Sequence, residues 1–211
     1  MKKDVLKIVV AVLLCCGGLA QAVPITIQIA GNITSASGVS LPGTIHTGTT
    51  FIGTYTYDSA TIASIVNGVG GHYVHNSPYG ISLSLGGYDF ETASNHVGQF
   101  DMWIANNQVD NGTNDHYTVF SDNIVSTLPT GFTIWYISWG LRDSTHDALS
   151  SNALPIAAPV LDDWNYNVLR IYAFDSLGYG ISIYGTVTRA TPEPLTGLLM
   201  ITGMFFLRHK R

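Results

Sequence analysis

Charged side chains are scarce in this chain of 211 residues, where Asp, Glu, Lys and Arg together make up 11%, against roughly a quarter in ordinary soluble domains. Between residues 23 and 190 there is no lysine, and three arginines stand against twelve acidic residues. Nucleic acids bind to clustered cations that neutralise phosphates, and anionic membrane surfaces attract basic segments. The composition of this central part therefore argues against both as partners.

Cysteine is nearly absent, since Cys15 and Cys16 are the only two in the chain. A form of the protein that lacks its first residues has no disulfide, no Cys-ligated zinc site and no cysteine nucleophile. An apolar core must then hold the fold together. The segment from residue 23 to residue 190 is long enough to bury about two thirds of the surface of the unfolded chain.

Long apolar runs are lacking as well, and neither end of the chain has the about 20 apolar residues that span a membrane. At the N-terminus three lysines precede a short apolar run, residues 8–14, and small residues follow at Ala20 and Ala22. This order is typical of a secretory signal peptide, and we expect signal peptidase to cleave after Ala22. A buried N-terminal helix, or a lipoprotein acylated at Cys15 or Cys16, is the alternative.

The C-terminus combines three elements in its last residues. They are the triplet Pro192-Glu193-Pro194, an apolar stretch at 195–207, and a basic end that contains Arg208, Lys210 and Arg211. The prolines break a helix, whereas the apolar stretch predicts a helix about 20 Å long. The basic end is expected to stay cytoplasmic. We therefore expect this segment to anchor the exported protein transiently in the inner membrane. A helix that lies on a membrane surface is the alternative.

This ending resembles the PEP-CTERM sorting domain, and the triplet Pro192-Glu193-Pro194 carries the resemblance. The resemblance implies recognition by exosortase, a membrane-embedded, transpeptidase-like cysteine protease that cuts near the triplet. It also implies a Gram-negative host that makes extracellular polysaccharide. The partners would be signal peptidase and exosortase, and the membrane-anchored precursor would become a cell-surface or extracellular protein. The last four residues read RHKR where the family usually has an arginine run.

Alternation of apolar and polar residues recurs throughout the central part, where helical periodicity is hard to find. We expect strands at residues 25–29, 51–57, 81–85, 97–105, 117–121, 132–139, 168–174 and 181–188. Most are apolar on one side only, as half-buried antiparallel strands are. Residues 132–139 are apolar on both sides, because Ile134 and Tyr136 alternate with three further apolar residues. We expect this strand in the middle of the core, with Trp135 and Trp139 packed inside.

Turn sequences such as Gly86-Gly87 and Leu177-Gly178 separate these segments, and prolines keep the irregular stretch 144–165 out of a central strand. Eight or nine short strands predict an all-β fold: one antiparallel β-sandwich or jelly roll over residues 23–190, flanked by the signal peptide (1–22) and the sorting segment (191–211). The segments FIGTYTYDS, LRDSTHDALSSNALP and YGTVTRATPEP resemble secreted all-β proteins that carry this tail. That similarity implies a fold and a cellular setting, without an activity.

Two pairs of side chains are candidates for catalysis or metal binding. Asp89 and Glu91 share one face of a strand, as paired carboxylates of glycoside hydrolases do, but an ordinary solvent-facing strand end is favoured. His72 and His75 carry imidazoles that bind metals, yet residues i and i+3 of a strand point to opposite faces. Exposed loop histidines are favoured here. No local catalytic motif is present, and a Ser–His–Asp set would have to be assembled by folding.

Two binding sites are further candidates. An oxygen-rich turn contains the possible calcium ligands Asp110, Asn111, Asn114 and Asp115, although an ordinary hairpin turn uses the same residues. No other cofactor is indicated. Four tryptophans and eleven tyrosines suggest stacking on sugar rings, although aromatic side chains also fill cores. Trp164, beside Asp162 and Asp163, is the best exposed candidate for a glycan site.

The sequence as a whole predicts an exported, surface-sorted, non-catalytic protein. The resemblance implies that it belongs to an extracellular polysaccharide or biofilm matrix. A carbohydrate-binding module and a secreted glycoside hydrolase are the two alternatives.

Overall fold

The computed structural model describes residues 24–66, 70–109 and 113–193. The predicted signal peptide, with Ala20 and Ala22, lies outside these residues, as do Pro194, the apolar stretch 195–207 and the basic end with Arg208, Lys210 and Arg211. Within the described part, no helix is long and apolar enough to cross a membrane.

Twelve strands and a short 3-10 turn, η1 (Leu161–Asp163), form the regular structure of these residues. The strands are β1 (Pro24–Ser37), β2 (Thr50–Asp58), β3 (Ile65–Val66), β4 (Gly70–His75), β5 (Gly80–Leu85), β6 (Tyr88–Thr92), β7 (Phe100–Val109), β8 (Thr113–Asp122), β9 (Ile124–Ser126), β10 (Thr133–Asp143), β11 (Tyr166–Phe174) and β12 (Gly180–Pro192). All eight segments expected to be strands overlap one of them. The all-β prediction is therefore confirmed.

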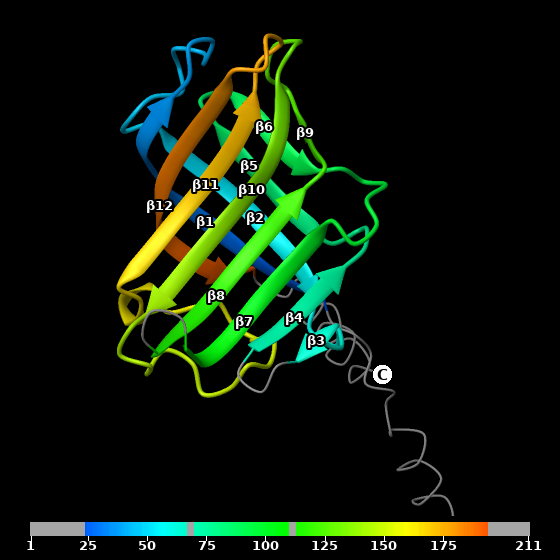
Figure 1. Cartoon of the computed structure of the whole chain (residues 1–211), viewed down its shortest axis with the longest axis vertical. Coiled ribbons are helices and arrows are strands. Elements are labelled where there is room, and N and C mark those ends of the chain that lie inside the picture. Colours follow the sequence, from blue (N-terminus) through cyan, green and yellow to red (C-terminus); the bar gives the residue numbers. More distant parts are fainter. Residues whose placement is uncertain (1–23, 67–69, 110–112, 194–211) are drawn as a thin grey trace, which may run out of the picture.

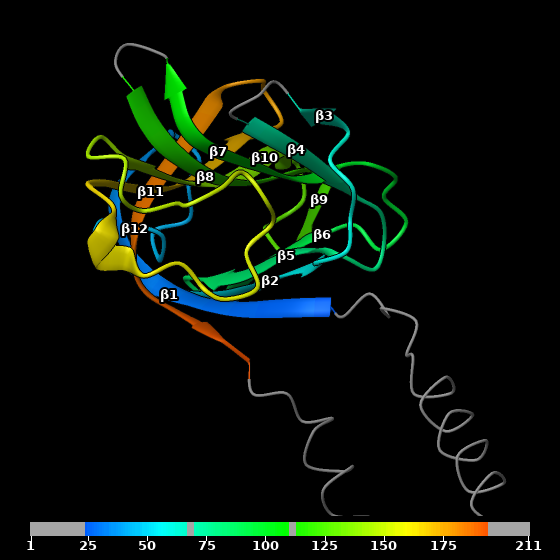
Figure 2. The same cartoon turned by 90° about the horizontal axis from the view of Figure 1, so that it is seen from below.

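All these strands belong to one antiparallel sheet with the order β3-β4-β7-β8-β10-β11-β12-β1-β2-β5-β6-β9. The sheet curls over on itself, so that β9 at one edge returns against β10. Figures 1 and 2 show two facing layers, one with β4, β7, β8, β10 and β11 and the other with β1, β2, β5 and β6, joined at one side by β12. Unlike the two separate sheets expected of a sandwich, these layers are halves of one continuous sheet, because β12 pairs with both β11 and β1.

The core fills the space between the two layers and is built from alternate residues of the strands. On β2, for example, Phe51, Tyr55 and Tyr57 are buried, and on β12 Ile181 and Ile183 are buried. Burying one such side chain stabilises the fold by about 1.5–3 kcal/mol. An apolar core thus replaces the disulfides that these residues cannot form.

The irregular stretch between β10 and β11 crosses one open end of the curled sheet, as Figure 2 shows. Its Leu154 belongs to the core, and the backbone carbonyls of Asn152 and Pro155 accept hydrogen bonds from the hydroxyls of Tyr73 (2.7 Å) and Tyr57 (2.6 Å). These bonds pair two buried phenols with loop carbonyls. The loop therefore closes the core where no strand covers it.

The β5–β6 connection is the two-residue turn expected at Gly86-Gly87, since Leu85 pairs directly with Tyr88. Both glycines have positive φ, 61° and 88°. A two-residue hairpin of type I′ needs positive φ at both positions, and glycine adopts it at little cost.

The last described residues continue the sheet beyond the expected boundary at Ala190. Thr191 and Pro192 pair with Gln28 and Ile27 of β1, and the backbone N–H of Glu193 donates to the carbonyl of Thr26 at 2.9 Å. The Gln28 side-chain amide also donates to the Glu193 carboxylate at 3.2 Å. The first two residues of the triplet therefore lie on the sheet and remain exposed to solvent.

Candidate functional site

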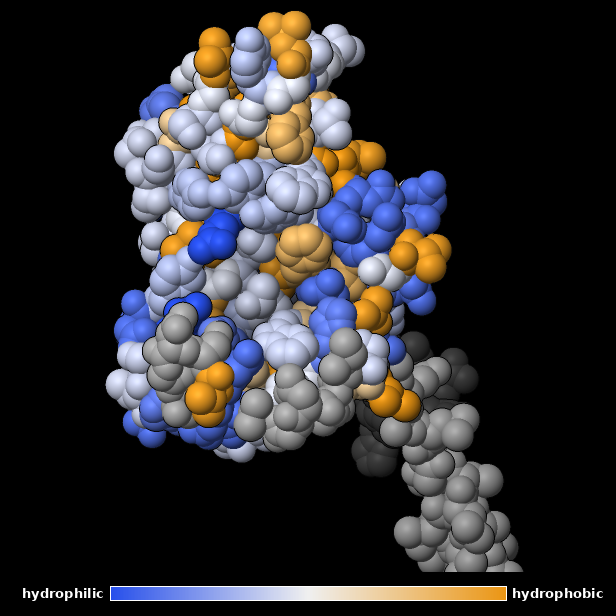
Figure 3. All heavy atoms as spheres, viewed as in Figure 1, coloured by the Kyte–Doolittle hydropathy of each residue, from blue (hydrophilic) through white to orange (hydrophobic). Residues whose placement is uncertain are grey.

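The outer face of β8, β10, β11 and β12 carries a group of aromatic side chains that we call the aromatic row. Its members are Phe120, Trp135, Tyr136, Tyr172, Phe174 and Tyr184. Trp135 is 58% exposed and Phe174 is 39% exposed. Figure 3 looks onto this side of the molecule, where residues of intermediate hydropathy, drawn pale, cover most of the surface over these strands.

Strand pairing brings these rings together from four neighbouring strands. Tyr136 and Tyr172 are direct partners on β10 and β11, and their ring centres are 4.9 Å apart. Phe120 follows on one side at 5.4 Å from Tyr136, and Tyr184 on the other at 6.0 Å from Tyr172. Trp135 contacts Phe174 with a centre distance of 6.0 Å. The rings thus form a continuous aromatic surface across the sheet.

A β-bulge in β10 explains why Trp135 belongs to this surface. The pairing of β10 with β11 shifts between Ile134 and Tyr136, so that Trp135 is the extra residue. An extra residue reverses the side on which the following side chains lie. Ile134, Ile137 and Trp139 are therefore buried, whereas Trp135 and Tyr136 both face outward. The expectation that Trp135 packs in the core is wrong, while that for Trp139 is confirmed.

Polar groups adjoin the aromatic row. Arg170 of β11 donates to the hydroxyl of Tyr166, and the guanidinium of Arg142 lies 5.8 Å from the centre of the Tyr166 ring. A hollow of about 160 Å³ lies between them, with Ser138 of β10 in its lining. The hydroxyls of Tyr172 and Tyr184 are hydrogen-bonded to each other, and this bond is the main cause of the raised pKa of Tyr184. Neutral phenols and guanidinium groups therefore offer hydrogen bonds beside the rings.

The predicted glycan residue Trp164 is not exposed. Only 8% of its surface is accessible, and its ring packs edge-on against Tyr117 of the core at a centre distance of 6.3 Å. Asp162 and Asp163 in η1 are exposed, and they line a hollow of about 360 Å³ with Asp143 and neighbouring residues. The expectation that Trp164 is exposed is wrong, because the loop turns the indole inward to cover the open end of the core.

The predicted carboxylate pair lies on the outer face of β6. Asp89 and Glu91 are both exposed on the same side of the strand, as expected, with the buried Phe90 between them. Asp89 accepts a hydrogen bond from Ser84 at 2.8 Å. Both carboxylates stand in solvent, which agrees with the favoured interpretation of a solvent-facing strand end.

His72 and His75 lie on opposite faces of β4, as their spacing predicts, but neither is in a loop. His75 is buried among Tyr57, Tyr79 and Phe100. Its Nδ1 is 3.1 Å from the hydroxyl of Thr61, while its Nε2 has no hydrogen-bond partner. Burial lowers the pKa of His75 to about 4, so this imidazole is neutral at physiological pH.

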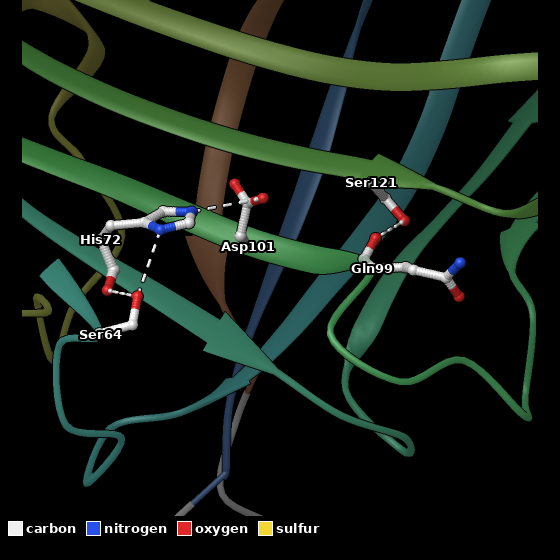
Figure 4. Close-up of polar contacts among 5 residues, drawn as sticks. All are labelled: Ser64, His72, Gln99, Asp101 and Ser121. Carbon is white, nitrogen blue, oxygen red and sulfur yellow. Dashed lines mark hydrogen bonds and ion pairs between the residues drawn. The ribbon is translucent and has the colours of Figure 1, made fainter.

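Folding does bring together a serine, a histidine and an aspartate, shown in Figure 4. The Nδ1 of His72 is 3.2 Å from the hydroxyl of Ser64, and its Nε2 is 3.5 Å from the carboxylate of Asp101. Burial raises the pKa of Asp101, and His72 partly offsets this effect. The same figure shows Ser121 of β8, whose hydroxyl donates to the carbonyl of Gln99, the residue before β7, at 3.2 Å.

The geometry of Ser64 and His72 fits a structural role. The Ser64 hydroxyl also donates to the backbone carbonyl of His72 at 3.0 Å, so its single proton is not available to the imidazole while that bond is made. The hollows over the aromatic row and at η1 are lined by other residues. These contacts tie β3 and β4 to β7 at the edge of the sheet, and we assign no catalysis to them.

The two described members of the predicted calcium turn are buried in the protein. Asn114 and Asp115 lie in β8, whereas Asp110 and Asn111 lie outside the described residues. The carboxylate of Asp115 accepts hydrogen bonds from the backbone N–H groups of Asn107 and Leu149, both at 2.8 Å. Both of its oxygens therefore already have partners. Among the described residues, no group of three or more His, Cys, Asp or Glu side chains could hold a metal ion.

The chain matches no family model, no curated protein and no solved structure. The functional argument therefore rests on the residues of this chain.

Proposed function

We propose that this protein is exported, sorted to the cell surface through its C-terminal segment, and binds extracellular polysaccharide without catalysis. The observation that carries the binding part is the exposed aromatic row on β8, β10, β11 and β12. The sorting part rests on the sequence of the two ends, in particular Pro192-Glu193-Pro194 and Ala20-Gln21-Ala22.

Aromatic rings at the surface are suited to sugar rings. The faces of pyranose rings present C–H groups, which pack against the electron-rich faces of aromatic side chains, and their hydroxyls need polar partners at the rim. The row offers the large exposed ring of Trp135, with Ser138 and Arg170 nearby on the same face. Contiguous exposed aromatic surface is also unusual for a protein that has no partner.

Charge points to the class of polysaccharide. Twelve acidic residues against three arginines between residues 23 and 190 give this part of the protein a negative potential, which repels polyanions. Net charge therefore favours a neutral polysaccharide, such as a β-linked glucan or an N-acetylated amino sugar polymer, over a uronic acid polymer. Arg142 and Arg170 beside the row then serve as hydrogen-bond donors to sugar hydroxyls.

The binding proposal is tested by co-sedimentation with phosphoric-acid-swollen cellulose and colloidal chitin, with alginate as the anionic comparison. The double variant Trp135→Ala/Tyr172→Ala removes two rings worth about 0.5–1.5 kcal/mol each, so its Kd should rise about 5- to 150-fold. Tyr179→Ala is the matched control, since Tyr179 is also 58% exposed but lies outside the row. Equal binding by all three proteins would refute the role of the row. A dimer that dissociates in the double variant would instead assign the row to self-association.

The sorting proposal is tested in an exosortase-bearing Gram-negative host. Replacement of Pro192-Glu193-Pro194 by three alanines should leave the precursor unprocessed in the membrane fraction. Mass spectrometry of the released form should show an N-terminus at Val23 in the unchanged protein. Unaltered processing and release of the triple variant would count against this part of the proposal.

A further inference from the structure

The opposite outer face of the molecule, formed by β1, β2, β5 and β6, carries a row of polar side chains in register. Gln28 pairs with Thr54, Thr54 with Ser82, and Ser82 with Glu91. Since directly paired residues point to the same side of a sheet, these four side chains form one line across four strands. No lysine lies among them, and three of the four can both donate and accept hydrogen bonds.

This face is hollowed along the same line. One hollow of about 270 Å³ and another of about 350 Å³ both have Thr54 and Ser82 in their linings, so they lie next to each other along this line. Glu91 lines the first hollow and Arg189 of β12 lines the second. We call the two hollows together the hydroxyl groove.

His96 forms part of the wall of this groove near Glu91. It is 3% exposed and lines the hollow of about 270 Å³ together with Tyr79. Its Nε2 donates to the backbone carbonyl of Tyr79 at 2.6 Å, because a carbonyl only accepts. Its Nδ1 is enclosed and has no hydrogen-bond partner among the described residues. Buried polar atoms are rarely left unpaired, so a hydrogen-bonding group is missing at this wall of the hollow.

We propose that the hydroxyl groove is a second saccharide-binding site, so that one molecule bridges two polysaccharide chains through its opposite faces. This inference rests on the proposed binding of polysaccharide by the aromatic row. Figure 2 shows the two layers from one end: the layer with β8, β10 and β11 and the layer with β1, β2 and β5 turn their outer faces in opposite directions. Two chains bound there cannot collide, because the core lies between them.

The two sites differ in the chemistry they offer to a sugar. The aromatic row presents ring faces, which suit the flat C–H surfaces of an extended chain. The groove presents hydroxyls of Thr54, Thr56 and Ser82, a carboxylate and a guanidinium, which suit the hydroxyl edges of the same chain. The groove therefore binds a neutral polysaccharide by hydrogen bonds.

A two-step capture assay tests the bridge. Xyloglucan is immobilised and loaded with the protein, the excess is washed off, and fluorescent mixed-linkage β-glucan is added. The unchanged protein should retain the fluorescent chain. Thr54→Arg places a long cation in the shared part of the groove, and it should still bind xyloglucan through the aromatic row while capture of the second chain is lost. Ser82→Arg is a second variant with the same expected result, and Thr50→Arg on the exposed start of β2 is the matched control.

The outcomes separate this inference from the proposed function. If Thr54→Arg and Ser82→Arg fold and still capture the second chain as Thr50→Arg does, the groove is not a saccharide site, although the aromatic row stands. If the unchanged protein binds xyloglucan but never captures β-glucan, the bridge is refuted in the same way. If the unchanged protein binds no polysaccharide in the first step, the proposed function fails together with this inference. A dimer could also bridge two chains, because each subunit could bind one chain through its aromatic row. A monomeric molar mass of the unchanged protein in light scattering excludes this.

Discussion

Two buried tyrosines in the core allow a sharp test of the structure. The hydroxyls of Tyr55 and Tyr117 are 2.6 Å apart, and both side chains are at most 1% exposed. Both rings also contact Trp139 edge-on, at 5.8 and 5.9 Å. Burial raises the pKa of both phenols well above the ordinary value, so neither ionises at physiological pH. Two hydroxyls that share one hydrogen bond leave one proton without an acceptor.

This arrangement predicts strong coupling between the two hydroxyls. Tyr55→Phe or Tyr117→Phe leaves the other hydroxyl buried and unpaired, which should lower the free energy of unfolding by about 1–3 kcal/mol. The double variant removes both polar groups and keeps both rings in place. Its stability should therefore lie within about 1 kcal/mol of the unchanged protein, well above the sum of the two single effects.

Urea unfolding of the four proteins, followed by tryptophan fluorescence and analysed by linear extrapolation, measures the effect. Tyr179→Phe, at a phenol that is 58% exposed, is the control and should change stability by less than about 0.5 kcal/mol. Additive losses in the double variant would refute the reasoning, because they would mean that each hydroxyl has a separate partner in the core.

Three further predictions follow from single residues. The pKa of His75 is lowered to about 4 in the folded protein from the ordinary 6.5, so His75 binds fewer protons in the folded protein than in the unfolded chain. Its contribution to the free energy of unfolding should be fully present above pH 6.5. That free energy should fall by about 3 kcal/mol as the pH is lowered towards 4. Urea unfolding at several pH values should show this slope, and His75→Phe should flatten it. At Gly31 a Cβ would lie 2.0 Å from the carbonyl oxygen of Thr186. Gly31→Ala should therefore separate β1 from β12 locally and lower the melting temperature. Gly43 has open space around it, so Gly43→Ala should leave the melting temperature unchanged. Asp115→Asn turns an amide N–H₂ towards a backbone N–H donor and should lower the free energy of unfolding by about 1–3 kcal/mol. An unchanged unfolding midpoint would contradict the hydrogen bonds from Asn107 and Leu149 to the Asp115 carboxylate.

Local alternation was sufficient to predict most of the strands, because one face of each strand is buried. Residues 81–85 and 168–174 fall within β5 and β11, and the turn at Gly86-Gly87 was predicted from its composition. The same signal does not distinguish one sheet from two. The single curled sheet depends on the pairing of β1 with β12, at opposite ends of the described chain, and alternation within a segment contains no information on such distant partners.

The candidate sites were harder to predict for the same reason. Tyr136 and Tyr172 are far apart in the sequence and meet because β10 and β11 are neighbours, while Tyr184 joins them from the following strand, β12. The acidic neighbours of Trp164 led to the expectation that it is exposed. Whether a loop side chain faces solvent or the open end of the core depends on where the loop crosses the sheet, which the sequence does not show. The available signal was a tyrosine at an outward-facing position in several of the expected strands. Such tyrosines indicate a common surface only when the order of the strands in the sheet is known.

The β-bulge at Trp135 separates the requirements of folding from those of binding. Trp139, four residues later in β10, is fully buried, and its replacement by alanine would cost about 3–5 kcal/mol through the loss of core packing. Trp135 is 58% exposed, and its ring contacts those of Tyr136 and Phe174 in the aromatic row, so truncation there should change stability by about 0.5 kcal/mol or less. The indole of Trp135 is exposed and adds little to the stability of the fold, and the β-bulge that holds it outward interrupts regular strand pairing. Selection for stability alone would not favour this arrangement. Stability accounts for Trp139, and binding is the explanation we propose for Trp135.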